Sequence, residues 1–315
     1  MNSPRLTVLM PVYNADKYLR DAIESILHQT YSNFDFIILD DGSTDNSLEL
    51  IRSYNDPRIR LVRHEENRGL VATLNEGVNL AETDLIARMD ADDISYPDRL
   101  EKQVAAFENN SELVLVGSDI DIIDDQGKLI SYGPKPANSN AIKRILSVIC
   151  PIAHPTVVFK KEAVLKSGGY KNYFVAEDYD LWTRLAEDGE LANIPVPLLK
   201  YRINTEGESI RKSGIQQMNS RIISSREWEK YGDAGPAPLE KWHEIWPEKK
   251  HLTNARSNET IFYANLHREF ARCYAERKQL KTALEHNLAA IYWQSSLRGG
   301  LADVYKTIRS YFNQS

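Results

Sequence analysis

The stretch "FIILDDGSTDNSLELI" (residues 36–51) decides the fold of this chain. An apolar run typical of a buried strand ends on Asp40 and Asp41, and apolar residues then return with helical spacing. Gly42 permits a tight exit from the strand, and the serine or threonine after it can cap the helix that follows. The sequence therefore predicts a strand, a sharp turn and a helix, with two carboxylates at the turn.

The same alternation runs through the first hundred residues and predicts an α/β fold. Strands are predicted at residues 5–13, 34–40, 58–64 and 84–90, and helices at 15–30, 45–54, 70–82 and from Pro97 onward. Strands separated by helices form βαβ units, so we expect a Rossmann-like, mostly parallel sheet with helices on both faces. Ligands bind at the carboxyl ends of such strands, which is where the acids at 40–41 and 90–93 fall.

After Leu100 the regular alternation of predicted strands and helices ends. Strands are predicted at 113–124 and 128–133, joined by the turn "DDQG", and again at 154–160. A helix is predicted from Glu177, and the prolines in 191–203 favour an extended edge segment. We therefore predict one domain over 1–213, with a first half (1–104) that carries the acidic strand ends and a second half (105–213) that looks like a substrate-recognition region.

The remaining residues, 214–315, predict a C-terminal helical appendage. Two segments in it are similar to one antiparallel helix pair of the tetratricopeptide kind, which is too short for a solenoid. From Lys249 onward there are eleven Lys or Arg and five Asp or Glu. Such a basic surface is either a solvated helical face or a peripheral contact with an anionic membrane.

Charge and cysteine usage narrow the class of protein. The net charge of −6 argues against a surface that binds nucleic acid, because neutralising phosphates needs an excess of Lys and Arg. The two cysteines, Cys150 and Cys273, lie far apart without metal-ligand spacing, which is typical of thiols in a reducing compartment. No apolar run reaches the length of a membrane span. We expect a cytoplasmic protein, or one at the inner face of the plasma membrane.

The acidic run after the fourth predicted strand is a candidate metal site. Asp90 and Asp92 are separated by one residue and repel each other unless a positive charge lies between them. Mg²⁺ or Mn²⁺ fits, because these cations prefer oxygen ligands and accept one or two carboxylates together with phosphate oxygens. The alternative is that the acids cap the next helix or lie in a solvated loop.

Two long stretches carry a family resemblance. "VLMPVYNADKYLRDAIESILHQTYSNFDFIILDDGSTDNS" and "ENRGLVATLNEGVNLAETDLIARMDADDISYPDRLEKQ" together resemble the N-terminal half of a family 2 glycosyltransferase with the A-type fold, from Leu6 to Gln103. The later "HPTVVFKKEAVLKSGGY" and "AEDYDLWTRLAEDG" resemble the acceptor half of that family and extend the match to Arg202. The resemblance implies that 1–213 is a catalytic domain, with a nucleotide-binding half over 1–104 and an acceptor-binding half over 105–213.

The resemblance assigns roles at the nucleotide and the metal. It implies that Asp41 accepts an N–H of a uracil-like base and that Asp40 lies at the strand end or near the ribose. Asp90 and Asp92 match the metal and diphosphate motif, with Asp93 as its less certain member. The nucleotide-binding residues implied in this way are Pro11, Val12, Tyr13, Asp41, Arg68, Asn75, Asp90 and Ala91, with Asn67 beside them. Helix capping and surface charge are the alternative roles of Asn67, Arg68 and Asn75.

The resemblance also implies a catalytic base. Displacing a nucleoside diphosphate from an anomeric carbon needs a base for the acceptor hydroxyl and a cation for the leaving charge. By resemblance, Asp178 is that base and Glu177 orients the acceptor. A helix N-terminus, which favours acids through its dipole, is compatible with both.

Two aromatic residues are the remaining acceptor-side candidates. His154 matches a family position, although a single His is commonly structural. Trp182 can form a sugar platform, but its helical register favours the core. The chain departs from its relatives at Arg202-Ile203-Asn204, where many carry Arg-x-His, so a third metal ligand there stays open.

The predicted function is that of an inverting, metal-dependent glycosyltransferase. It would move a sugar from a nucleoside diphosphate, with UDP expected, to a glycan or lipid-linked acceptor, using Mn²⁺ or Mg²⁺. A sugar nucleotidylyltransferase would need a Gly-rich phosphate loop after the first strand, where "PVYNADKY" stands instead. A dinucleotide-dependent oxidoreductase would need G-x-G-x-x-G there. A non-catalytic scaffold would be expected to lose acids that this chain keeps.

Overall fold

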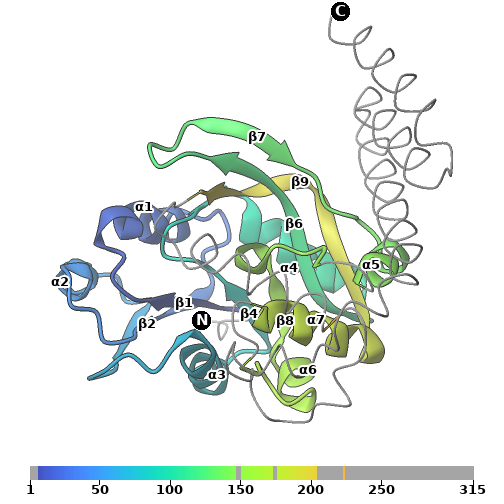
Figure 1. The fold of residues 1–315 in the computed structure, drawn as a ribbon, viewed down its shortest axis with the longest axis horizontal. Helices are drawn as coiled ribbons and strands as arrows, with labels where there is room; N and C mark the ends of the chain where they lie inside the picture. Colours follow the sequence, from blue (N-terminus) through green and yellow to red (C-terminus); the bar gives the residue numbers. More distant parts are fainter. Residues whose placement is uncertain (1–5, 147–149, 173–175, 204–222, 224–315) are drawn as a thin grey trace, which may run out of the picture. The chain divides into compact units, whose positions relative to one another are not determined.

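The computed structural model describes residues 6–146, 150–172, 176–203 and 223 (Figure 1). The chain divides into two compact units, Met1–Ser224 and Ser225–Ser315, and every described residue belongs to the first. The predicted helical appendage, its basic face and Asn204 lie outside the described residues. The boundary predicted at residue 213 also stays a prediction.

One sheet of nine strands organises the described residues. Its order is β3-β2-β1-β4-β8-β6-β9-β5, with β7 paired to β6. Strands β3, β2, β1 and β4 are mutually parallel, as the sequence predicts, and β9 is parallel to β6. The strands are β1 Leu6–Val12, β2 Phe34–Asp40, β3 Ile59–Arg63, β4 Leu85–Arg88, β5 Ile94–Ser95, β6 Leu113–Ile123, β7 Leu129–Gly133, β8 Val158–Lys160 and β9 Glu190–Arg202.

Helices cover both faces of the sheet, which confirms the predicted layers. Alternate residues of a strand point to opposite faces, so Met10 of β1 lies in one core cluster and Leu9 in the other. The first cluster contains side chains of α1, α2 and α4, and the second contains side chains of α3, α5, α6 and α7. The helices are α1 Asp16–Leu27, α2 Ser47–Arg52, α3 Leu70–Leu80, α4 Arg99–Asn109, α5 Ser139–Leu146, α6 Lys161–Lys166 and α7 Glu177–Asp188.

The second half departs from a purely parallel arrangement. Strand β8 is antiparallel to both β4 and β6 and so joins the two parallel groups. The strand predicted at 154–160 is wrong in its first part, because His154–Thr156 form a 3₁₀ helix, η1. Pro155 has no N–H for a ladder, and the N–H and hydroxyl of Thr156 both bond to the carbonyl oxygen of Ala153. In Figure 1 the hairpin of β6 and β7 curls away from the parallel strands.

Strand β9 confirms the predicted extended edge segment over most of its length. It pairs with β6 throughout, whereas β5 covers it only at Leu199 and Lys200. Its register with β6 shifts between Ile194 and Pro197. Prolines are tolerated there because an irregular edge does not need every N–H in the ladder.

The first turn of α2 corrects the predicted cap. Neither hydroxyl residue after Gly42 caps this helix. The carboxylate of Asp45 instead accepts the backbone N–H of Ser47 at 2.9 Å. The helix is also shorter than the predicted 45–54, since it spans Ser47–Arg52. Helices in the described part of the chain all lack the combination of length and apolar character that a membrane crossing requires.

The buried strand β2, between β1 and β3, offers a direct test of the core. Ile38 is fully buried and lies between Met10 of β1 and Leu61 of β3. Ile38→Ala should lower the free energy of unfolding by about 2–5 kcal/mol through lost burial and a residual cavity. Val196→Ala, at a 39% exposed position of β9, should change it by less than about 0.5 kcal/mol. Urea unfolding followed by circular dichroism measures both, and equal losses would contradict the assignment of the core.

Candidate active site

Two loops at the carboxyl ends of β1 and β2 are fastened to each other. The N–H of Asn14 donates to Oγ of Ser43 at 3.1 Å, and Oδ1 of Asn14 accepts the N–H of Thr44 at 2.8 Å. The N–H of Asp16 donates to the carboxylate of Asp45 at 3.1 Å. Asn14 has φ 49°, a left-handed conformation that Asn tolerates better than most residues. These contacts hold the tips of the first two parallel strands as one surface.

Asp41 fastens a third loop to this surface. Its carboxylate is 4% exposed and accepts the N–H groups of Arg68 and Gly69, each at 2.9 Å. Nδ1 of His64 lies 2.6 Å from the same carboxylate. Burial alone would raise the pKa of Asp41, but these hydrogen bonds hold it below its usual value. Asp41 is therefore ionised. The hydrogen bond predicted from an N–H of the nucleobase would add to those from three protein donors.

His64 is a functional candidate that sequence reasoning missed. It is 2% exposed, and Nε2 lies 3.0 Å from Oε2 of Glu76 while Nδ1 contacts Asp41. Glu76 also accepts from the Arg68 guanidinium at 3.2 Å. The histidine after β3 thus links the loop at 64–69 to α3. In the sequence, the position of His64 directly after an expected strand was the signal that could have identified it.

The other residues predicted to bind the nucleotide differ in their exposure and in their contacts. Tyr13 is 49% exposed beside the half-buried Pro11, whereas Val12 is buried in the core. Asn67 and Arg68 have exposed side chains on the third loop. The amide of Asn75, in α3, donates to the carbonyl oxygen of Tyr170 and accepts the N–H of that residue, both at 2.8 Å. Asn75 therefore clamps the loop before α7, and a nucleotide contact for it stays a prediction.

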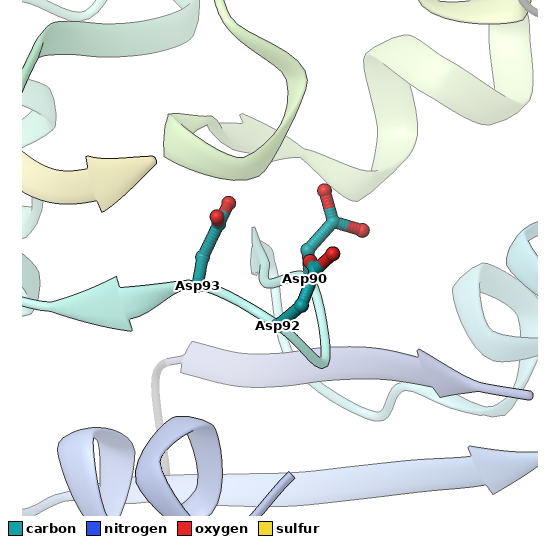
Figure 2. A group of neighbouring side chains, drawn as sticks. All are labelled: Asp90, Asp92 and Asp93. Atoms are coloured by element: carbon teal, nitrogen blue, oxygen red, sulfur yellow. The ribbon is translucent and has the colours of Figure 1, made fainter. Parts of the chain in front are cut away.

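Asp90, Asp92 and Asp93 form an acidic cluster in the loop between β4 and β5, beside the buried Ala91 (Figure 2). Each offers one oxygen within 4.8 Å of the others. Burial and the charges of Asp92 and Asp90 raise the pKa of Asp93 well above its usual range. Oδ2 of Asp93 is buried and has no hydrogen-bond partner within the described residues. A hard divalent cation fits this donor set, because it would neutralise the cluster and occupy that oxygen.

Arg202 holds this loop in place from the end of β9. Its backbone N–H donates to Oδ1 of Asp93 at 2.8 Å, and its Nε donates to the carbonyl oxygen of Asp92 at 2.8 Å. Its guanidinium also lies over the ring of Tyr18 in α1, 4.4 Å from the centroid. Arg202, the first residue of the Arg-x-Asn sequence that departs from the family pattern, therefore supports the acidic cluster independently of the role of residue 204.

Arg88 is a second buried arginine at the cluster. It ends β4 and forms an ion pair with Asp90 through Nη1. The sequence offered a signal, since a charged residue in a buried strand directly before an acidic run is unusual.

Glu177 and Asp178 open α7 as predicted. Asp178 is half-buried, accepts the N–H of Tyr179 at 2.7 Å and contacts Sγ of Cys150 at 3.8 Å. Burial raises the pKa of Asp178 to about 6, and burial together with the Asp178 charge raises that of Glu177 to about 7. The charge of Asp90 contributes to the shift at Glu177, so the two acidic groups lie within electrostatic reach of each other.

The acceptor-side aromatic candidates are buried. His154 lies in η1, with Nε2 3.0 Å from the hydroxyl of Tyr170 and Nδ1 3.9 Å from Glu177. Burial, with a smaller effect of Arg88, lowers the pKa of His154 well below its usual range, so the ring is neutral. Trp182 is 0% exposed and packs edge-on to His154 at 5.7 Å. In this structure Trp182 lies in the core, and it presents no face to a sugar.

The sheet, with acids at the carboxyl ends of β2 and β4, has the α/β arrangement that the resemblance to A-type glycosyltransferases predicts. The chain belongs to the family described as Glycosyl transferase family 2, whose match spans residues 7–166. It is 37% identical to the O-antigen biosynthesis glycosyltransferase WbnJ of Escherichia coli over 71% of this chain and 88% of WbnJ. It is 36% identical to the putative glycosyltransferase EpsE of Bacillus subtilis over 71% of this chain and 82% of EpsE. It is therefore a glycosyltransferase.

Solved structures share the fold at low sequence identity. TarS of S. aureus in complex with UDP-GlcNAc aligns with a TM-score of 0.58 at 13% identity, covering 93% of each chain. The mannosyltransferase PcManGT of Pyrobaculum calidifontis, in complex with GDP-Man and Mn²⁺, aligns with a TM-score of 0.57 at 20% identity, covering 99% of this chain and 84% of that one. These similarities confirm the predicted fold.

Gly42 tests how the three loops are held. It has φ +75°, and a Cβ there would lie 2.7 Å from the backbone carbon of Glu66 in the third loop. Gly42→Ala should therefore cost more than the roughly 1–2 kcal/mol of left-handed strain alone, and it should displace the loop at 64–69. Gly168→Ala is the matched control, because Gly168 has φ +87° with nothing within 4 Å.

Thermal unfolding and hydrogen exchange at residues 64–69 measure both effects. Faster exchange there is expected in Gly42→Ala and not in Gly168→Ala. The same behaviour in both variants would show that the close approach of Gly42 to Glu66 has no structural role.

Proposed function

We propose that this glycosyltransferase is an inverting, metal-dependent enzyme that transfers a sugar from a nucleoside diphosphate, UDP in the first instance, to a hydroxyl of a glycan or lipid-linked acceptor. One observation carries the proposal: two acidic groups with different surroundings lie in the loop after β4 and at the start of α7, within electrostatic reach of each other. Asp90, Asp92 and Asp93 form one group, and Glu177 and Asp178 form the other. The first suits a cation and diphosphate, and the second suits proton transfer.

The comparisons support the substrate classes. The names of WbnJ and of the amylovoran biosynthesis glycosyltransferase AmsE of Erwinia amylovora, which is 34% identical, refer to polysaccharides. The solved structures that share this fold were determined in complex with UDP, UDP-GlcNAc or GDP-Man. We propose synthesis of a cell-surface polysaccharide at the cytoplasmic side of the membrane. The basic C-terminal residues would supply a peripheral contact there.

Asp90, Asp92 and Asp93 would hold Mn²⁺ or Mg²⁺ in this proposal. The bound cation supplies charge neutralisation for the diphosphate, which makes it a better leaving group. The chain itself fixes the carboxylates of Asp90 and Asp93 through Arg88 and Arg202, and Arg202 also holds the backbone of Asp92, so that these groups do not need to be ordered on binding.

Asp178 would act as the general base. The acceptor oxygen attacks the anomeric carbon, the bond from that carbon to the diphosphate oxygen breaks, and the hydroxyl proton passes to the Asp178 carboxylate. A carboxylate with a raised pKa is a stronger base than an exposed one, which favours this transfer. Glu177, beside it, would orient the acceptor. Attack opposite to the leaving group inverts the configuration at the anomeric carbon.

A donor screen tests this function. Purified protein is incubated with a panel of UDP, GDP and other nucleotide sugars, with Mn²⁺ and with a chelator, and nucleotide release is measured. Cation-dependent turnover of one donor is expected. Failure to bind or turn over every donor would favour the alternative of a non-catalytic scaffold with this fold.

Asp178→Asn should abolish transfer, because an amide cannot accept the hydroxyl proton. We expect a loss of about a hundredfold or more in kcat with nucleotide affinity within about threefold of wild type. Asp188→Asn, a half-exposed position at the other end of α7, is the matched control and should keep full activity. Full transfer by Asp178→Asn would refute the assignment of the base.

The pH profile tests the same residue. Since the base works only when ionised and the pKa of Asp178 is raised to about 6, kcat should fall as pH decreases through 7 to 6. Below that range we expect about a tenfold loss per pH unit. Nucleotide binding measured at each pH separates this effect from loss of the cation. A flat kcat between pH 5 and pH 7.5 would contradict a base with a raised pKa.

A further inference from the structure

Asn75 makes a two-point contact with a backbone 95 positions further along the chain. Its Nδ2 donates to the carbonyl oxygen of Tyr170, and its Oδ1 accepts the N–H of the same residue, both at 2.8 Å. A side-chain amide that bonds both backbone groups of one residue fixes the position and the direction of the chain there. The contact therefore joins α3, in the first half of the domain, to the segment that leads to α7.

The close approach of these two segments needs a glycine beside Tyr170. Gly168 and Gly169 both have left-handed backbones, with φ +87° and +71°. A Cβ on Gly169 would lie 2.7 Å from Oδ1 of Asn75, whereas a Cβ on Gly168 would meet nothing within 4 Å among the described residues. Left-handed strain is thus common to both positions, and the approach to Asn75 belongs to only one of them.

Helix α7 holds the same turn through Arg184. The guanidinium of Arg184 donates to the carbonyl oxygens of Ser167 and Gly169, the latter at 2.8 Å. Asp180, one turn earlier in α7, accepts from Nε of Arg184 at 3.0 Å and so directs the guanidinium toward the turn. The turn at Ser167–Tyr170 is therefore bonded to a side chain of α3 and to a side chain of α7.

Tyr170 carries the contact on to the acceptor-side acids. It is 3% exposed, and its hydroxyl lies 3.0 Å from Nε2 of His154. The other ring nitrogen of His154 lies 3.9 Å from Oε1 of Glu177, which is a contact rather than a hydrogen bond. Trp182 of α7 packs edge-on against the same imidazole at 5.7 Å. A shift of Tyr170 would therefore move a side chain that packs against Glu177 and α7.

We propose that Asn75 is a positioning residue of the acceptor side, which holds Tyr170, and through it His154 and Glu177, in the place that transfer requires. The inference rests on the proposed function, in which Glu177 orients the acceptor. Groups at a reacting centre must be placed to within a fraction of an ångström, so loss of this clamp slows transfer. A nucleotide contact of Asn75, in contrast, would act on the affinity for the nucleotide.

Two pairs of variants separate the clamp from general stability. Asn75→Ala removes both hydrogen bonds, and Asn79→Ala is its control, at an exposed position one turn further along α3. Gly169→Ala displaces the Asn75 amide, and Gly168→Ala is its control, with similar left-handed strain and no such approach. The rate kcat is measured as nucleotide release from the donor that the screen identifies, with water as the acceptor and saturating Mn²⁺. Titration calorimetry measures the affinity for UDP and, in parallel, for GDP.

The expected result is a loss of rate without a loss of nucleotide affinity. Asn75→Ala and Gly169→Ala should each lower kcat about tenfold or more, with nucleotide affinity and donor KM within about threefold of wild type. Asn79→Ala and Gly168→Ala should keep kcat within about threefold, although both glycine variants lower the melting temperature.

A merely structural role predicts equal losses of kcat in the two glycine variants, because both are strained to a similar extent. That result would overturn the proposal. A loss of nucleotide affinity of about tenfold or more in Asn75→Ala would also overturn it, in favour of a direct nucleotide contact.

Tyr170→Phe covers the case in which Asn75→Ala does not fold. It keeps the backbone contact with Asn75 and removes only the hydroxyl that faces His154. It should lower kcat about threefold to tenfold, and combining it with Gly169→Ala should add little, because both changes act along one chain of contacts. Fully additive losses would show that the clamp acts by another route and would refute the inference.

Hydrogen exchange separates this inference from the proposed function. Absence of turnover by the wild type with every donor would refute the proposed function. The clamp is then tested at the backbone N–H groups of Tyr170, Tyr179 and Asp180, all of which are hydrogen-bonded. Exchange at all three should be faster in Asn75→Ala than in Asn79→Ala, and equal exchange in these two variants would refute the clamp.

Discussion

The structure depends on one electrostatic constraint, which is the gathering of like charges at one edge of a sheet. Parallel strands deliver their carboxyl ends to the same edge, and this chain places acids at the ends of β2 and β4. Buried carboxylates repel one another and lose their hydration, so each needs donors from the protein. Asp41 has two backbone N–H groups and His64, Asp93 has the N–H of Arg202, and Asp90 has Arg88. The loops have the shape that supplies these donors.

The same constraint explains why the two sides of the site differ. Hydrogen-bond donors from the segment after β3 satisfy Asp41 so fully that its pKa falls, and it is a fixed negative charge. Hydrogen bonds stabilise Glu177 and Asp178 of α7 less than they stabilise Asp41. The effect of burial is therefore the larger one, and it raises the pKa values of both residues. A fixed charge suits recognition of a donor group, and a proton acceptor poised near neutrality suits chemistry. The chain reaches both conditions with the same residue types by varying the supply of hydrogen-bond donors.

Much of this could be predicted from the sequence where local pattern and chemistry agree. The βαβ alternation, the helix at Glu177 and the acids at the strand ends follow from periodicity and from the geometry of parallel sheets. Other features depend on contacts between distant residues, which periodicity does not report. Asn75 pairs with a backbone 95 positions away, and the 3₁₀ turn at His154 forms where a proline interrupts an otherwise strand-like run. The buried Arg88 can be recognised in the sequence as a charged residue in an apolar strand, but the residues that it contacts cannot be predicted from the sequence.

The hydrogen bond between Asp93 and Arg202 has a consequence for how the protein is made. The two residues lie 109 positions apart, so the acidic loop after β4 leaves the ribosome long before the strand that fastens it. At a synthesis rate of roughly 5–20 residues per second, this interval lasts about 5–20 s. During that time the nascent chain carries the acids of the donor side without the arginine that holds them, and the acceptor helix α7 emerges before β9 is complete. The donor side, although encoded first, is therefore finished last, and a nascent chain acquires its complete set of acid-holding contacts only after nearly all of the described sheet has been synthesised.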